Sequence, residues 1–292
     1  MMMASSCVAC QSNALSFFGT RLRHDYHVCD TCGTLQLCPM PTEAELQAAY
    51  SLDYAAHADA MHDAGPVDPI VLNRDHERYH GRIVDVVKSC GISGPILEIG
   101  CGFGGLCSQA IRAGLPWEGV DLSEQAVAYC QKQGLPVRVA KLADINDKQY
   151  GAIVMCFVFE HLPEYDGFLS DCRQRLLPQG RIITLHPTAP FAHFFGTLLR
   201  MGNTRRPLPR LDCSFVPPWH TTLLSVAGTR AMAARNGFGV ERVMPSPTGR
   251  FGGIGRRTAQ AVIQEVNRIG WSLVGEPWPL TPAHMVVMRA QG

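Results

Sequence analysis

The sequence predicts an α/β fold in which a doubly wound, mainly parallel sheet follows a small cysteine-rich module. From Pro95 onward, short β-branched runs alternate with helical patterns, which is typical of right-handed strand–helix–strand crossovers. The runs at 96–99 and 152–159 are almost continuously apolar, as in strands that are buried on both faces. Two Cys-x-x-Cys pairs stand in the first 40 residues, where this alternation is missing.

The pattern divides the chain into three parts. Residues 1–40 are turn-rich and hold both cysteine pairs, residues 41–94 are mostly helical, and residues 95–292 carry the alternating strands and helices. Within the last part, the connection at 187–220 is too long for an ordinary loop, so we expect it to contribute to a substrate site.

That connection is rich in aromatic and arginine side chains. The aromatic rings suit an apolar or ring-shaped acceptor, and the guanidinium groups suit a phosphate or a carboxylate. The alternative is an exposed basic loop that contributes a few aromatic rings to the core. The side chains concerned are Phe191, Phe194, Phe195, Trp219, Arg200, Arg205, Arg206 and Arg210.

Composition narrows the class of protein. With 292 residues, 46% of them hydrophobic and 17% charged, the chain can bury a sizeable core. A formal net charge of +1 gives no general attraction to nucleic acid or to an anionic membrane. We expect no membrane span, because no run approaches the ~20 apolar residues that one needs. The start, "MMMASSCVACQSN", lacks the features of a signal peptide, so a cytoplasmic location is expected.

The helical part contains recognisable helix signals. Thr42 and Glu45 have the spacing of a capping box, which predicts that a helix begins there. The segment "GPVDP" at 65–69 should interrupt the helical pattern. The stretch from 73 onward predicts a second, amphipathic helix that stops near Gly91.

Seven strands and several helices are expected after that. The strand candidates are 95–101, 117–123, 137–140, 152–159, 181–187, 238–244 and 284–290. Helices are expected near 105–113, 123–133 and 166–176, with a looser link at 141–151.

A glycine-rich turn follows the first of these strands. In "LEIGCGFGGL", Gly100, Gly102 and Gly104 allow a sharp bend and let a ligand lie against the backbone. Glu98 stands two residues before the first glycine, and Asp121 ends the next strand, 17 residues after Gly104. An acid in that place can accept hydrogen bonds from ribose hydroxyls, which predicts a nucleotide-type cofactor site.

These stretches resemble a known family. "ILEIGCGFGGL" and "GVDLS" are similar to the first two motifs of the class I S-adenosylmethionine-dependent methyltransferases, and "RLLPQGRIITLHP" resembles the family's turn into its fifth strand. The resemblance covers about residues 95–190 and implies a Rossmann-like, seven-stranded sheet. One departure is Gly151, which stands where the family usually has an aspartate.

The resemblance also implies which residues meet S-adenosylmethionine. The glycine loop would pass under the methionine part, Asp121 would bind the ribose, and residues after the second and third strands would flank the adenine. The implied set is Glu98, Gly100, Cys101, Gly102, Gly104, Asp121, Leu122, Leu142, Ala143, Asp144 and Phe157. The alternatives are that Gly104 only serves helix packing, that Asp121 caps a helix and that Asp144 is an ordinary loop residue.

Three histidines are candidate general bases for an oxygen acceptor. His161 and His186 follow the fourth and fifth strands, and His220 lies in "PPWHTTLLS". A structural role is the alternative for each. Related quinone-pathway O-methyltransferases carry an extra acid three residues before such a Glu160-His161 pair. Phe157 stands there, and since two ligands hold a divalent ion poorly, no catalytic metal is expected.

The cysteine pairs predict a structural zinc ion. Cys7, Cys10, Cys29 and Cys32 have zinc-ribbon spacing, and four thiolates fill a tetrahedral zinc without leaving a position for water. Two disulfides are the alternative, which a reducing compartment disfavours. The metal would stabilise a module that is too small to fold on its own core.

The order of these parts resembles bacterial methyltransferases that act on sugars, surface glycans and secondary metabolites. In that resemblance, Tyr50 and Tyr54 of "CPMPTEAELQAAYSLDY" close over the cofactor as a lid; both could instead pack a helix. Because the chain ends soon after the core, we expect O-methylation rather than C-methylation of a small-molecule or glycan acceptor. A ribosomal-RNA guanine methyltransferase, or a non-catalytic homologue that binds cofactor or a partner, is the alternative; the oligomeric state is left open.

Overall fold

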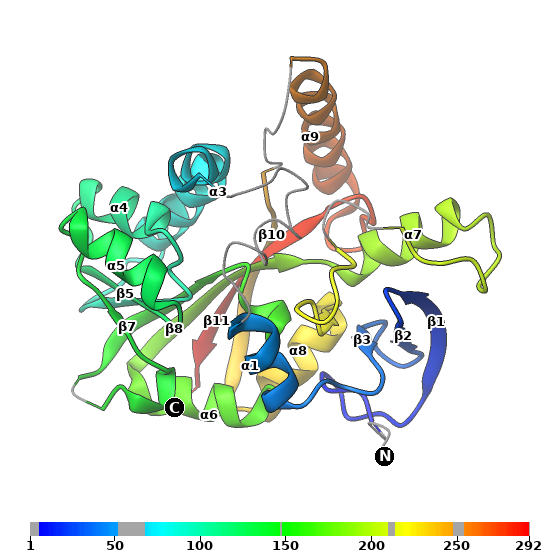
Figure 1. Ribbon diagram of the computed structural model, residues 1–292, viewed down its shortest axis with the longest axis horizontal. Coiled ribbons are helices and arrows are strands. Elements are labelled where there is room, and N and C mark those ends of the chain that lie inside the picture. Colours follow the sequence, from blue (N-terminus) through cyan, green and yellow to red (C-terminus); the bar gives the residue numbers. More distant parts are fainter. Residues whose placement is uncertain (1–5, 52–67, 147, 210–213, 248–253, 292) are drawn as a thin grey trace.

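The computed structural model describes residues 6–51, 68–146, 148–209, 214–247 and 254–291. A seven-stranded sheet runs through the centre of the molecule, and a four-stranded sheet lies beside it near the N-terminus (Figure 1). Within these residues, no helix has the length and apolar character needed to cross a membrane.

The large sheet confirms the predicted fold class. Its strands are β4 (Ile96–Ile99), β5 (Trp117–Asp121), β6 (Val137–Val139), β7 (Tyr150–Cys156), β8 (Leu176–Pro187), β10 (Phe238–Pro245) and β11 (Ala283–Ala290). Their order is β10-β11-β8-β7-β4-β5-β6, and only the pairs made by β11 are antiparallel. All seven strands overlap the predicted segments, although β8 begins five residues earlier than predicted and β7 ends three residues earlier. The carboxyl ends of the parallel strands lie at one edge of the sheet, and sheets of this kind bind their ligands at that edge.

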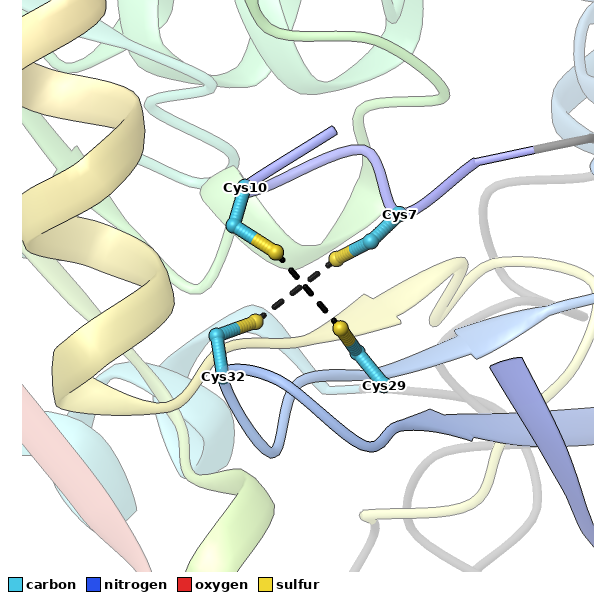
Figure 2. A group of neighbouring side chains, drawn as sticks. All are labelled: Cys7, Cys10, Cys29 and Cys32. Atoms are coloured by element: carbon cyan, nitrogen blue, oxygen red, sulfur yellow. Dashed lines mark hydrogen bonds between the residues drawn. The ribbon is translucent and has the colours of Figure 1, made fainter. Parts of the chain in front are cut away.

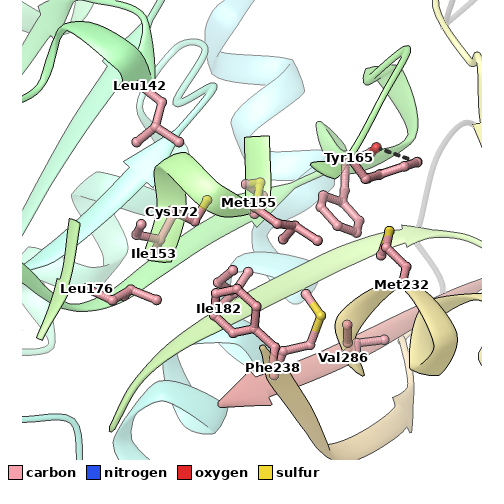
Figure 3. Packing of buried hydrophobic residues seen from close by; sticks show 14 of the residues in the cluster. Leu142, Ile153, Met155, Tyr165, Cys172, Leu176, Ile182, Met232, Phe238 and Val286 are labelled. Atoms are coloured by element: carbon pink, nitrogen blue, oxygen red, sulfur yellow. Dashed lines mark hydrogen bonds between the residues drawn. The ribbon is translucent and has the colours of Figure 1, made fainter. Parts of the chain in front are cut away.

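The central strands are apolar because helices cover both of their faces. Every residue of β7 is buried except Cys156, which is half-buried. Met155, Ile182 and Phe238 come from three different strands and pack into one core with the side chains around them (Figure 3). Gly151 is explained by close packing, since a Cβ atom there would overlap the carbonyl oxygen of Ser93. The family's usual aspartate could not fit at this position.

The predicted helices are present. They are α4 (Gly105–Arg112), α5 (Glu124–Lys132) and α6 (Asp166–Arg175), and the looser link contains a short 3-10 helix, η1 (Leu142–Asp144). In the preceding part, α1 (Glu43–Ser51) begins with the predicted capping box: the Thr42 N–H donates to Glu45 Oε2 at 2.8 Å, and the Glu45 N–H donates to Thr42 Oγ1 at 3.2 Å.

Helix α3 (Pro69–Ser89) holds the start of α4. Asp68 caps α3 by accepting a hydrogen bond from the Ile70 N–H, as the break at 65–69 suggests. Asn73 donates from Nδ2 to the Phe103 carbonyl at 3.0 Å, inside the glycine-rich turn. A Cβ atom on Gly105 would overlap the side chains of Asn73 and His80. The two helices therefore meet closely beside the turn (Figure 1).

The small sheet was not foreseen from the sequence. It is formed by β1 (Leu15–Arg21), β2 (His24–Cys29), β3 (Leu35–Leu37) and β9 (Thr222–Leu223), in that order. The last strand comes from far along the chain: Leu35 pairs with Leu223, and Gln36 pairs with Thr222. The residues that carry the cysteine pairs therefore share a sheet with a segment of the larger domain.

Three helices complete the described structure. They are α7 (Ala189–Leu199), α8 (Val226–Arg235) and α9 (Ile254–Val274). The sequence did not predict α7 or α9. Helix α7 lies above the small sheet, and α9 projects from the top of the molecule (Figure 1).

Replacing Gly105 by alanine should destabilise the contact between α3 and α4. We expect the free energy of unfolding to fall by about 1–3 kcal/mol, because the new methyl group needs space that Asn73 and His80 occupy. Urea denaturation followed by tryptophan fluorescence measures this change. Gly255→Ala in α9 is the control, since nothing lies within 4 Å of the new atom, and it should gain up to about 1 kcal/mol. Equal stability of the two variants would contradict the packing argument.

Candidate functional site

The glycine-rich turn has the backbone geometry that only glycine adopts easily. The φ angles of Gly100, Gly102 and Gly104 are 69°, 49° and 72°. A Cβ atom on Gly100 would overlap Val158, which lies just after β7, and one on Gly104 would overlap Cys130. Gly104 therefore serves packing as well as turn formation, and the loop lies directly against the segment that leaves β7.

Asp121 is tied to this loop from the end of β5. Its Oδ2 accepts a hydrogen bond from the Gly102 N–H at 2.7 Å, and its Oδ1 accepts one from the Ser123 N–H at 2.9 Å. Burial raises the pKa of Asp121, and these backbone donors oppose the rise. The side-chain cap of α5 is Ser123, which accepts from the Ala126 N–H. A carboxylate has about four lone-pair sites, so Asp121 retains capacity for a ligand.

Glu98 lies inside the sheet below the turn. It is buried, and its Oε2 accepts a hydrogen bond from Trp117 Nε1 at 2.8 Å. Burial raises the pKa of Glu98 to about 8, although the Trp117 donor acts in the opposite direction. The side chain is therefore mainly protonated at neutral pH and orders the strand end without carrying a full charge.

The residues expected near an adenine ring follow two neighbouring strands. Leu122 comes directly after β5 and is 62% exposed, an unusual exposure for leucine. Leu142, Ala143 and Asp144 form η1 after β6, where Leu142 is buried and the other two are exposed. Cys101, which was included in the expected cofactor set, is buried against Gly119.

The chain turns sharply as it leaves β7. Phe157 has a φ angle of 57°, a left-handed conformation that is uncommon for a bulky residue. Its N–H donates to the Leu185 carbonyl at 2.8 Å, and its ring meets the edge of Tyr79 at 5.2 Å between centroids. Strained backbone of this kind is often found at functional sites. Tyr79, which belongs to α3, was not singled out by the sequence.

Beyond this turn, Glu160, His161 and His220 come together. Glu160 and His161 belong to the short helix η2 (Phe159–His161), and the ligand atoms of all three residues lie within 4.8 Å of one another. The two imidazole rings are 5.2 Å apart between centroids and inclined by 32°. Burial raises the pKa of Glu160 to about 8.

The backbone of η2 fixes the segment that carries His220. The Thr221 N–H and Oγ1 both donate to the Glu160 carbonyl oxygen, each at 3.0 Å. Tyr26 of the small sheet donates from its hydroxyl to the His220 carbonyl at 2.9 Å. Strand β9 begins two residues after His220, so the small sheet determines where this histidine lies.

His186 lies apart from that group. It is buried at the end of β8, pairs across the sheet with His284, and has Nδ1 3.1 Å from the Pro187 carbonyl oxygen. Burial lowers the pKa of His186 to about 4, so the ring is neutral at physiological pH. Such a low pKa makes it a weak proton acceptor.

The four cysteine side chains point toward a common centre (Figure 2). The Sγ atoms of Cys7 and Cys32 are 3.7 Å apart, and those of Cys10 and Cys29 are 3.5 Å apart. Four sulfurs around one zinc ion at about 2.3 Å would be separated by about 3.8 Å, so the set fits this ion. Both separations are longer than the about 2.05 Å of a disulfide bond.

The cysteine cluster is anchored to the larger domain. Ser225 Oγ donates to the Cys32 carbonyl oxygen, and Arg235 Nη1 donates to the Ala9 carbonyl oxygen at 2.6 Å. Arg235 also forms an ion pair with Asp166 of α6 at 2.8 Å. The cluster therefore lies in a continuous set of contacts with α6 and α8.

Comparison with known proteins agrees with the fold. Residues 97–182 match the family described as a methyltransferase domain. The structure superposes on magnesium protoporphyrin IX methyltransferase from Synechocystis PCC 6803, solved with bound SAH, with a TM-score of 0.55 and 15% identity, covering 84% of this chain and 99% of that one. Residues 97–182 thus form a methyltransferase domain, and the structure has the fold of this S-adenosylhomocysteine-bound methyltransferase.

Curated relatives match the same methyltransferase domain. The ubiquinone biosynthesis O-methyltransferase of Alkalilimnicola ehrlichii is 28% identical over 112 residues, which are 34% of this chain and 45% of that protein. The protein of that name from Bartonella bacilliformis is 35% identical over 104 residues, or 32% and 42%. Demethylmenaquinone methyltransferase of Tropheryma whipplei is 29% identical over 126 residues, or 40% and 50%. The chain thus spans at most half the length of these relatives.

The arginines of the 187–220 connection differ from one another in their surroundings. Arg200 is buried, donates from Nε to the Gly196 carbonyl at 3.0 Å and to the Phe18 carbonyl, and lies 4.3 Å from the centroid of the Phe18 ring. The hypothesis that it grips an anionic substrate is therefore wrong; it fastens α7 to β1. Arg205 and Arg206 are exposed.

The remaining residues that the sequence singled out are the aromatic side chains of the 187–220 connection and the two tyrosines of the proposed lid. Phe191 is buried, Phe194 is 46% exposed and Trp219 is half-buried. Tyr50 belongs to α1, but its side chain is outside the described part of the structure. Tyr54 and Arg210 also lie outside the described residues.

Replacing Glu98 by glutamine should remove a pH dependence of stability. The folded pKa of about 8 lies above the ordinary value of 4.5, so the folded state binds this proton more tightly. The associated stability is complete below the unfolded pKa and is lost as the pH rises through the folded pKa. Glutamine keeps an acceptor for Trp117 and does not ionise.

We expect Glu98→Gln to resemble the wild type near pH 5 and to exceed it by about 2–4 kcal/mol near pH 8, at about 1.4 kcal/mol per pKa unit. Urea denaturation at several pH values measures the difference. Glu124→Gln on the surface of α5 is the control and should show no pH-dependent difference. A Glu98→Gln effect that is constant across the pH range would show that ionisation is not its cause.

Proposed function

We propose that this protein transfers a methyl group from S-adenosylmethionine to a hydroxyl oxygen of a small-molecule or glycan acceptor. The observation that carries the proposal is the glycine loop joined to Asp121 through the Gly102 N–H, directly beside the exit of β7. Relatives named as O-methyltransferases support oxygen as the acceptor atom. The near-neutral charge of the chain gives no support to an RNA acceptor.

The chain's residues would bind and orient the reactants. The loop from Gly100 to Gly104 would lie under the methionine part of the cofactor, Asp121 would accept from the ribose hydroxyls, and the exposed Leu122 would cover one face of the adenine. Asp144 and its neighbours in η1 would border the adenine edge, and Phe157 would border the methyl group. The bound cofactor supplies an already activated methyl group, so alignment and exclusion of water are the protein's main tasks.

The transfer is an in-line displacement. The bond between the methyl carbon and sulfur breaks as the bond to the acceptor oxygen forms, and the electron pair remains on sulfur. The hydroxyl proton must leave the acceptor during this step. Gly100 of the loop packs against Val158, two residues before Glu160, and Glu160 lies close to His161 and His220, so this group is where we place the acceptor hydroxyl. His186 remains a weaker candidate because its pKa is low.

We also propose a structural zinc ion at Cys7, Cys10, Cys29 and Cys32. The sulfur separations support it, and four thiolates leave no position at which zinc could activate a water molecule or a substrate. The ion would stabilise the turns that precede β1 and β3. Through β9, it would also stabilise the position of His220.

The acceptor class can be tested directly. The purified chain is incubated with methyl-labelled S-adenosylmethionine and with panels of phenols, hydroxy acids, nucleotide sugars and RNA. We expect label on a hydroxyl compound. Label on RNA alone would overturn the acceptor class. Calorimetry that detects no cofactor binding would overturn the enzymatic proposal and favour a partner-binding role.

Asp121→Asn should weaken cofactor binding by about 10- to 100-fold. A hydrogen bond that involves a charged group contributes about 1.5–3 kcal/mol, which corresponds to this factor. Isothermal titration with S-adenosylhomocysteine measures the affinity without turnover. Asp85→Asn on the exposed side of α3 is the control and should bind like the wild type. Wild-type affinity in Asp121→Asn would remove this residue from the cofactor site.

Cys29→Ser should lower the zinc content and the yield of folded protein. Loss of one thiolate leaves three sulfur ligands, and the folding free energy supplied by the metal decreases. Zinc analysis by mass spectrometry and thermal unfolding measure the two effects. Cys38→Ser, nine positions further on and outside the cluster, should retain its zinc. Full stability of Cys29→Ser without zinc would contradict a structural metal.

A further inference from the structure

The carboxylate of Glu160 is in an unusual position for an acid. The residue is 1% exposed, and neither carboxylate oxygen accepts a hydrogen bond from another residue in the described part of the chain. A buried carboxylate without hydrogen bonds is costly, and proteins usually tolerate one only when it is neutral, paired with a cation or bound to a metal. Glu160 therefore needs a cationic partner if it is to function as a carboxylate.

The side chains that face Glu160 are of the type that binds metal ions. A nitrogen of His161, a nitrogen of His220 and a Glu160 oxygen all lie within 4.8 Å of one another. Two ligands of one ion with bonds of about 2.1 Å lie about 3–4 Å apart, so small side-chain movements would bring all three onto one ion. Glu160 and His161 are sequence neighbours, and His220 comes from a segment that the small sheet positions.

The surroundings of His220 also favour metal binding by its ring. The Nδ1 atom of His220 lies 3.1 Å from the Ser214 carbonyl oxygen, which places the ring proton on Nδ1 and the lone pair on Nε2. Metal-binding histidines usually have such a backbone or carboxylate partner on the second nitrogen, because it fixes the tautomer and the ring orientation. The Glu160 backbone is held in turn by Thr221, so the ligand-bearing segments are bound to each other.

We propose that Glu160, His161 and His220 bind one divalent metal ion, at a second site distinct from the four cysteines. One carboxylate and two imidazoles favour ions such as Zn²⁺, Mn²⁺, Fe²⁺ or Co²⁺ over Mg²⁺ and Ca²⁺, which prefer oxygen ligands. The sequence interpretation counted only two ligands here, because His220 is 59 positions away from His161.

Three protein ligands leave coordination positions open for a hydroxyl group. A bound divalent ion lowers the pKa of a coordinated hydroxyl, which would ease loss of the acceptor proton to water. This catalytic role rests on the proposed function, whereas metal binding by the three side chains does not. In this arrangement, the two histidines act as ligands rather than as proton acceptors.

Metal content tests the site. The protein is loaded with excess Co²⁺, desalted and analysed for metal, and its absorption spectrum separates the two sites, because only cobalt bound to cysteines gives thiolate charge-transfer bands. We expect two equivalents per chain for the wild type and one for Glu160→Gln, with the thiolate bands unchanged. Glu98→Gln is a matched control, as it makes the same substitution at another buried glutamate, and it should retain two equivalents.

Thermal unfolding gives a second readout that does not depend on activity. Without metal in the second site, Glu160→Gln should unfold at a higher temperature than the wild type, because its side chain cannot carry a negative charge in the buried site. Excess Co²⁺ should raise the midpoint of the wild type above that of the variant, since only the wild type has the second site to which the ion can bind in the folded state. His220→Gln should also lose the second equivalent.

The possible outcomes separate the two proposals. A total of one metal equivalent (zinc plus cobalt) in the wild type, or of two in Glu160→Gln, would overturn the second metal site. Full methyl transfer by protein that holds metal only at the cysteines would refute the catalytic role and leave the proposed function intact. A second bound ion without methylation of any acceptor would support the site and count against the proposed function.

Discussion

The pairing of β3 with β9 is the interaction on which the arrangement of the site depends. It joins Leu35 to Leu223 and Gln36 to Thr222, although 186 or more residues separate the partners. Cys32 precedes β3 on one side of this pair, and His220 precedes β9 on the other. A metal at the cysteines would therefore order β3 and, through this short ladder, the histidine beside Glu160. In the proposed function, the small module would thus help to position the acceptor site.

Buried polar contacts make this connection specific. Gln36 is fully buried, and its side chain accepts from the Val8 N–H at 2.9 Å and donates to the Ser6 carbonyl oxygen at 3.3 Å, so the first cysteine turn is tied to β3. The Tyr26 hydroxyl does the same for the His220 backbone. Because buried amides and hydroxyls cost free energy when they lose their partners, a displaced module would leave several of them unsatisfied. The fold therefore favours one position of the module.

The sequence predicts the parts of the fold that local patterns encode. Short sequence patterns predict the seven strands, the capping box at Thr42 and the glycine turn, and the structure has each of them in the predicted segment. The β3–β9 pair is not local: β9 has two residues, too few for a periodic signal. His220 and Glu160 are also far apart in the sequence, so no local pattern predicts that they come together. Arg200 looked like an anion ligand because sequence does not reveal that backbone carbonyls surround its guanidinium group.

Two buried glutamates differ in the partners that surround their carboxyl groups. Glu98 and Glu160 are almost equally buried, and burial raises the pKa of each to about 8. Glu98 has a hydrogen-bond donor, the Trp117 indole, and a clear role inside the sheet. The described residues provide no such donor to the oxygens of Glu160, while two imidazoles lie beside them. A glutamine could replace Glu98 at little cost. The buried carboxylate of Glu160 destabilises the fold unless a cation offsets its charge. The surroundings of Glu160 are therefore better explained by the binding of a ligand than by a role in folding.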